Sequence, residues 1–270
     1  MRSWYLVGLL ILLTPVLSRA VADRDGLSSP SGTRVAYVEG KETEDSFNAE
    51  ITITDRTGKV QRRIMLDDPL PGCNAITSTK WVDENRLGVE CHINPSNGGY
   101  IVLDAGAGKV LDTFVGSNFA WSPDGKHMAN NGSVGHFGEH SDSLEIDGKQ
   151  VFPLESDAQD DAVHAFGQWR WATDSKKVAL VDLVLPEGRL SVVVADIRGR
   201  SLVWNAPFPE GTSAAPVMDE DEHEDREQAL YLARDGFAFS WEGPTTLRVF
   251  NGDLNWSIPL RLHRKTSTRK

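Results

Sequence analysis

The chain has 270 residues, of which 40% are hydrophobic, and a formal net charge of −11 at pH 7. This acidity disfavours binding to nucleic acid and to anionic lipid, because both would be repelled. The length allows one large all-β domain or two small domains.

Residues 1–22 show the three parts of a secretory signal peptide. Arg2 gives a positive start, residues 4–17 are nearly all apolar, and Ala20 and Ala22 are small residues before a cleavage site. The apolar run is shorter than the roughly 20 residues that a membrane span needs. We therefore expect export to a periplasm or to the extracellular space, with no membrane span once the signal is removed. An uncleaved N-terminal anchor is the alternative.

Five segments along the chain share a turn between two strand-like runs. They begin at Ser28, Trp81, Trp121, Trp171 and Trp241. Ser-Pro-Asp-Gly after Trp121 favours a tight turn, because Pro presets φ and Gly accepts a positive φ. The alternating apolar residues that follow such turns are typical of half-buried strands. Each Trp is expected to pack as a large apolar anchor between neighbouring sheets.

Further strands are expected in each repeated unit. A third strand is predicted at Glu50–Thr54, Tyr100–Leu103, Ser143–Ile146 and Leu190–Ala195. A fourth strand is predicted at Val60–Met65, Val110–Phe114 and Ser201–Trp204. Repeated units of four antiparallel strands are the pattern of a β-propeller.

Residues 23–262 are therefore predicted to form an all-β propeller of about five four-stranded blades. The last unit has no clear fourth strand, so we expect the segment Asp23–Ser28 to complete it and close the ring. An open array or a β-sandwich is the alternative architecture. Residues 263–270 form a basic tail that is expected to be disordered.

Two of these segments carry a family resemblance. Trp121-Ser-Pro-Asp-Gly-Lys-His-Met-Ala129 resembles the repeat core of TolB-like, WD40-like propellers, whose blades carry a W-S-P-D-G-K-type turn. Trp171-Ala-Thr-Asp-Ser-Lys-Lys-Val-Ala179 is similar, whereas the other three segments match loosely. The resemblance covers about residues 27–260 and implies a propeller fold. Bacterial members of this family are commonly periplasmic, which agrees with the signal peptide.

The chain contains two cysteines, Cys73 and Cys91. An exported protein meets an oxidising compartment, and these residues flank one predicted β-hairpin, so we predict a disulfide between them. No metal-type spacing of cysteines exists.

His136-Phe-Gly-Glu139-His140 matches the H-x-x-E-H pattern of inverted zinc peptidases. That chemistry needs a helix to bring positions i and i+4 together, whereas the flanking Asn, Gly and Ser residues favour a loop. We therefore interpret the segment as a polar loop, with incidental metal binding together with Asp142 as the alternative. No metal, cofactor or catalytic residue is assigned.

A second candidate region lies around His164. Trp169 and Trp171 are two residues apart on a predicted strand, so they point to the same face and either pack in the core or form a binding surface. The candidate binding residues are His136, Glu139, His140, Asp142, His164 and Trp169.

The sequence favours an exported, non-catalytic platform that binds another envelope or secreted protein through its loops. The oligomeric state stays open. The first alternative is a hydrolase or lyase, with or without a metal, whose site lies at the channel mouth; convergence of His136, His140 and His164 would favour it. The second alternative is a structural component of an envelope complex.

Overall fold

The structure is a computed structural model of the chain and is all-β. It describes residues 26–42, 47–94, 97–132, 142–153, 163–185, 188–197, 202–207, 234–251 and 254–260. The predicted signal peptide and the basic tail lie outside these ranges. The predicted third and fourth strands are confirmed with small shifts of their ends, except that the strand predicted at Val110–Phe114 is the first part of a longer strand, Lys109–Trp121. The described part of the last unit has three strands, as expected.

The strands form four antiparallel sheets, and the seven-stranded sheet, β5 to β11, is divided here at the shared strand β8, which gives five successive units. Unit 1 contains β1 (Leu27–Ser28), β2 (Arg34–Glu42), β3 (Phe47–Asp55) and β4 (Val60–Asp67). Unit 2 contains β5 (Ala75–Trp81), β6 (Arg86–Asn94), β7 (Asn97–Asp104) and β8 (Lys109–Trp121). Unit 3 contains the end of β8 with β9 (Met128–Gly132), β10 (Ser143–Ile146) and β11 (Lys149–Phe152). Unit 4 contains β12 (Val163–Trp171), β13 (Lys177–Leu185), β14 (Arg189–Asp196) and β15 (Leu202–Pro207). Unit 5 contains β16 (Ala238–Glu242), β17 (Thr246–Asn251) and β18 (Leu254–Pro259).

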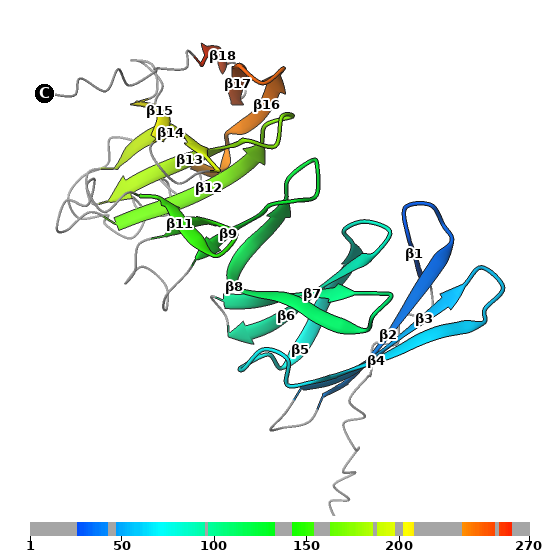
Figure 1. Ribbon diagram of the computed structural model, residues 1–270. Helices are drawn as coiled ribbons and strands as arrows, with labels where there is room; N and C mark the ends of the chain where they lie inside the picture. The colour runs from blue at the N-terminus through cyan, green and yellow to red at the C-terminus, as the bar shows by residue number, and fades with distance from the viewer. Residues whose placement is uncertain are drawn as a thin grey trace, which may run out of the picture.

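Within each unit, neighbouring strands in the sequence are neighbours in the sheet, which is the strand order of propeller blades. The units follow one another along an open arc, with unit 1 in blue at one end and unit 5 in orange and red at the other (Figure 1). Closure of a ring is therefore not confirmed.

The expected role of the segment Asp23–Ser28 in closure is also not confirmed. Its described end, Leu27–Ser28, pairs with Ala36 and Val35 of β2 inside unit 1. The reason is the tight turn after Ser28, in which Gly32 has a φ of 65° and returns the chain at once to form the partner strand. Residues 23–25 lie outside the described ranges.

The hydrophobic core is divided into layers, each of which lies between two successive units. Ile51 of unit 1 and Val89 of unit 2 share one buried layer. Tyr100 of unit 2 and Met128 of unit 3 share the next. Leu144 of unit 3 packs in a layer with Leu180 of unit 4, and Val192 of unit 4 packs in a layer with Leu247 of unit 5. Burial of these apolar faces is the main force that holds the units together.

The predicted Trp anchors also form a repeated hydrogen bond between units. The indole Nε1 donates to a backbone oxygen in three places: Trp81 to Leu27 at 2.8 Å, Trp171 to Ala120 at 3.0 Å, and Trp241 to Arg170 at 3.3 Å. Each acceptor belongs to the preceding unit. It is the residue directly before the first position of that unit's repeated segment, which is Ser28, Trp121 or Trp171. Trp121 is the exception, because its indole donates to the Tyr100 hydroxyl at 3.0 Å.

A second repeated contact comes from a cation at the start of the strand that follows the turn. The cation donates to a backbone oxygen in the turn of the next unit: Arg34 Nη1 to Glu84 at 3.1 Å, Arg86 Nη2 to Gly125, and Lys177 Nζ to Pro244 at 3.0 Å. Between units 3 and 4 the turns meet differently, since the Asp124 N–H donates to Ser175 Oγ at 3.0 Å. These bonds fix how adjacent turns lie against each other.

The Lys177 contact can be tested by substitution. The Lys177 side chain is only 8% exposed and binds both Asp174 Oδ2 and the Pro244 oxygen at 3.0 Å. Lys177→Met is expected to lower the free energy of unfolding by about 1–3 kcal/mol, because both acceptors lose a charged donor. Urea denaturation measures this. Lys176→Met is the control, because Lys176 is the neighbouring residue and is exposed. An equal loss of stability in the two variants would contradict the role assigned to Lys177.

The predicted disulfide between Cys73 and Cys91 is confirmed, with a Cα–Cα distance of 5.6 Å. Both cysteines are buried. Gly99 on β7 lies against the bridge, and a Cβ at this position would lie 2.7 Å from Cys91 Sγ and 3.0 Å from Cys73 Sγ. The absence of a side chain at Gly99 therefore makes room for the bridge.

Reduction of the bridge is expected to lower the free energy of unfolding by about 3 kcal/mol, since it closes a loop with a sequence separation of 18. Denaturation of the purified protein with and without reductant measures this. The double variant Cys73→Ala, Cys91→Ala is the control, and its stability should not respond to the reductant. An oxidised wild type that matches the variant would contradict the expectation.

Within the described ranges, no helical segment reaches the length and hydropathy that a bilayer crossing requires.

Candidate functional site

The predicted candidate residues divide into two groups. His136, Glu139 and His140 lie outside the described residues, so the H-x-x-E-H motif stays a prediction. Asp142, His164 and Trp169 are described and lie in or beside units 3 and 4. In the part of the chain that the structure describes, no three His, Cys, Asp or Glu side chains gather in a way that could hold a metal ion.

Asp142 and His164 lie together, although their contact is through the backbone. The Asp142 N–H donates to the His164 backbone oxygen at 2.7 Å. Asp142 Oδ2 accepts from the Phe166 N–H, also at 2.7 Å. Asp142 thus supplies partners for backbone groups along the edge of β12, which ties the start of β10 to unit 4.

The His164 imidazole forms a buried pair with a carboxylate that the sequence analysis did not select. His164 Nδ1 lies 2.9 and 3.0 Å from the two carboxylate oxygens of Asp182 on β13. Asp182 is 1% exposed and His164 is 9% exposed. Phe152 meets the imidazole edge-on, with ring centroids 5.3 Å apart. The only sequence signal for this pair is that Asp182 interrupts the apolar run of β13.

Burial raises the pKa of Asp182, and the hydrogen bond from His164 opposes this shift. Ser191 lies opposite Asp182 on β14, and its buried hydroxyl has no hydrogen-bond partner. A nucleophilic Ser needs a base within reach and a path for the substrate. Ser191 and Asp182 are both almost wholly buried inside unit 4. The described geometry therefore supports a structural polar cluster.

The Asp182 pKa lies above its ordinary value of 3.8, which gives stability a defined pH dependence. Above pH 3.8, the Asp182 carboxyl group loses its proton more readily in the unfolded chain than in the folded chain. The contribution of Asp182 to the free energy of unfolding therefore falls as the pH rises through the folded-state pKa. Asp182→Asn is expected to remove this slope, which urea denaturation at a series of pH values measures.

Asp67→Asn is the control for this experiment, because Asp67 is exposed on β4. The control should keep the slope of the wild type. An unchanged slope in Asp182→Asn would contradict the assigned direction. So would a wild type whose free energy of unfolding rises relative to that of Asp182→Asn as the pH increases.

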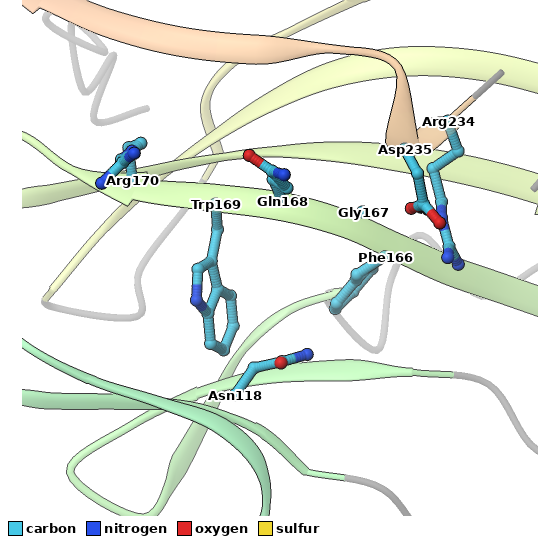
Figure 2. Close-up of a pocket in the computed structure, with 8 residues that line it drawn as sticks. All are labelled: Asn118, Phe166, Gly167, Gln168, Trp169, Arg170, Arg234 and Asp235. Carbon is cyan, nitrogen blue, oxygen red and sulfur yellow. Dashed lines mark hydrogen bonds and ion pairs between the residues drawn. The ribbon is translucent and has the colours of Figure 1, made fainter. Parts of the chain in front are cut away.

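A pocket of about 330 Å³ lies beside this polar cluster (Figure 2). Its walls are formed by Asn118, Phe166, Gly167, Gln168, Trp169, Arg170, Arg234 and Asp235. These residues come from β8, from β12 and from the turn before β16, which are the segments that open units 3, 4 and 5. Among the sequence candidates, Trp169 is a pocket residue.

A β-bulge in β12 shapes this pocket. Phe166 lies opposite Asp182 and Trp169 lies opposite Leu180, so three steps along β12 match two steps along β13. In a regular strand, residues three apart point to opposite faces. The extra residue turns both rings to the same side of β12, toward Asn118, as Figure 2 shows.

The facing part of β8 has the same irregularity. Ser117 lies opposite Asn131 and Ala120 lies opposite Ala129, which again matches three steps with two. Asn118 is within this bulge and has a φ of 54°, in the left-handed region. The pocket therefore lies where two bulged strands face each other.

Among the described residues that line the pocket, two carry guanidinium groups. Arg170 is exposed at one end of it, and Arg234 lies at the other end, where its Nε donates to Asp235 Oδ1 at 2.8 Å (Figure 2). Arg234 crosses β12 directly over Gly167, since a Cβ at Gly167 would be 2.9 Å from Arg234 Cγ. Asp235 and Gly167 both contribute to the position of the Arg234 side chain.

No family model matches the sequence, and no curated protein matches it. The resemblance to TolB-like propellers therefore stays a prediction. Three solved structures show weak similarity over 87% of the chain. The β-propeller domain of the Trilobed protease from Pyrococcus furiosus, described as an open velcro topology, is 14% identical with a TM-score of 0.38 over 69% of its length. A putative dipeptidyl aminopeptidase IV from Bacteroides ovatus is 11% identical with a TM-score of 0.44, and the match spans 38% of it. A prolyl endopeptidase is 12% identical with a TM-score of 0.40, and the match spans 34% of it. At these TM-scores the similarity carries no argument about activity.

Proposed function

We propose that the protein is an exported, non-catalytic propeller-type platform that binds another envelope or secreted protein. The five units act as its blades, and the partner binds where β8, β12 and the segment before β16 open units 3, 4 and 5. The observation that carries this proposal is the pocket on the opening segments of units 3, 4 and 5.

The composition of this pocket supports binding. Protein pockets that bind ligands combine aromatic walls with a few fixed polar groups. Phe166 and Trp169 provide the aromatic wall, and Asn118 and Gln168 provide amide donors and acceptors. All four side chains stand on strands that are hydrogen-bonded into sheets, which keeps their positions fixed.

The hydrolase or lyase alternative rests on His164 and on the H-x-x-E-H motif. Acid–base catalysis needs a group that reaches the reacting atoms. His164 is nearly buried and faces Asp182 inside unit 4. A binding role therefore has better support from the described residues than a catalytic role has.

Two features support export. The N-terminal residues 1–22 have the pattern of a signal peptide. The bond between Cys73 and Cys91 is consistent with an oxidising compartment.

Site-specific photocrosslinking in cells of the source organism tests the platform. A photoreactive amino acid replaces Gln168 at the pocket, and in a matched control it replaces Gln61 on β4, which is exposed on unit 1. We expect a discrete crosslinked protein from position 168 that is absent from position 61. Trp169→Ala in the same background should lower the yield, because truncation of a central aromatic contact weakens binding by about tenfold or more.

Trp169 also packs in the core, so the exposed pocket residue Asn118 supplies a second variant, Asn118→Ala. A thermal melt of each variant shows whether it is folded. Equal crosslinking from positions 168 and 61 would refute binding through the pocket. Crosslinking from position 168 that neither Trp169→Ala nor Asn118→Ala reduces would also refute it.

A further inference from the structure

Strands in the three middle units are buried on both faces. In β13 of unit 4, the residues Lys177–Val184 are all buried, and β9 of unit 3 is buried along its whole length. In β7 of unit 2, Tyr100–Asp104 is buried except for its last residue. Successive residues of a strand point to opposite faces of the sheet. Each middle unit is therefore covered on both sides, by the unit before it and the unit after it.

The strands of units 1 and 5, at the two ends of the arc, follow a different pattern (Figure 1). In β3 of unit 1, Ile51 and Ile53 are fully buried, whereas Thr52 between them is partly exposed. In β17 of unit 5, Thr246–Val249 alternates between partly exposed and buried residues. Such alternation is typical of an antiparallel sheet that is covered on one face. The buried faces are those that pack against units 2 and 4, so the other two faces point away from the array.

Each outward face carries an ion pair. On unit 1, Arg63 Nη1 lies 3.3 Å from Glu50 Oε1, and on unit 5, Arg248 Nε lies 2.7 Å from Glu242 Oε1. Between 34% and 66% of each of these side chains is exposed. A second sheet packed on either face would remove these charges from water, and the cost of desolvation offsets the gain from contact. The outward faces are therefore suited to water.

Part of the outward face of unit 1 is covered from within the unit. Tyr37 lies against Gly26, since a Cβ at Gly26 would be 2.6 Å from Tyr37 Cε1. The same Cβ would be 2.3 Å from Val35 Cγ1. These apolar groups thus have partners in their own unit.

Few large apolar side chains are exposed on the outward faces. Among the described residues they are Val60 and Met65 on unit 1 and Phe250 on unit 5. Arg63 stands between Val60 and Met65 on β4, so these two do not form a continuous apolar surface. Single exposed apolar residues are normal on a protein surface.

We propose that units 1 and 5 are end caps, whose outward faces stay in water and keep the array open. The outward faces then neither close a ring with each other nor stack on a second copy of the chain. Terminal units with a polar outer face serve this purpose in other repeat proteins. The inference goes beyond the proposed binding function and holds whatever the pocket binds.

Distances between spin labels in the purified mature protein test this proposal. One label pair, Met65→Cys with Ser257→Cys, stands on the two outward faces, at exposed positions of β4 and β18. The control pair, Arg62→Cys with Val110→Cys, stands at exposed positions on the faces that meet between units 1 and 2. A closed ring would bring the outward faces to the spacing of packed sheets, about 10 Å. We expect pulsed electron paramagnetic resonance to give a longer distance for the outward pair than for the control pair.

Substitutions on adjacent residues provide a second test. Met65→Lys and Ser240→Asp place a charge on the outward faces and are each expected to leave the urea midpoint and the monomeric state unchanged. Their controls are Leu66→Lys and Phe239→Asp, which direct the same charge into the buried faces and should lower the midpoint strongly or prevent folding. Equal distances in the two label pairs would overturn the proposal. So would a loss of stability in an outward variant that matches its control, or a dimer of the wild type that an outward variant dissociates.

Discussion

The packing of each unit against the next is the contact on which the rest of the structure depends. An antiparallel sheet with one apolar face is stable only when that face is covered. Here the cover is the neighbouring unit, as Ile51 and Val89 show between units 1 and 2. Three Trp indoles and three cations then fix the alignment, because each reaches a backbone oxygen of an adjacent unit. A pocket assembled from units 3, 4 and 5 exists only while these junctions hold.

The junction between units 2 and 3 follows a different arrangement. β8 belongs to both units, since its first part pairs with β7 and its end pairs with β9. Trp121 binds the Tyr100 hydroxyl in place of a backbone oxygen, and the Arg86 guanidinium lies 4.9 Å from the Trp121 ring centroid. A shared strand already holds the two units side by side, so the usual indole bond is not needed there. In Figure 1, β8 runs from the strands of unit 2 to those of unit 3.

The sequence predicted the parts of the fold that follow a regular period. The turn after Trp121, the alternating strands and the disulfide could all be inferred from local residue types. The cation contacts were missed, because Lys177 and Pro244 are 67 positions apart and no local pattern joins them. Alignment of the repeats on the strand that follows the turn would have shown the signal, since Arg34, Arg86 and Lys177 each begin that strand. Ring closure could not be inferred from strand counts, because a terminal segment can pair at either end.

The pocket was only partly predictable for a related reason. Trp169 was selected because strand alternation puts it on the same face as Trp171, whereas Phe166 would then point the opposite way. The bulge at Gly167 and Gln168 breaks that alternation and brings Phe166 to the same side as Trp169. The glycine also admits Arg234, which comes from another unit. The residues that follow the strand alternation thus build the sheets, and the residues that break it build the pocket. Periodicity in the sequence therefore locates the sheets, whereas the pocket is found only from the structure.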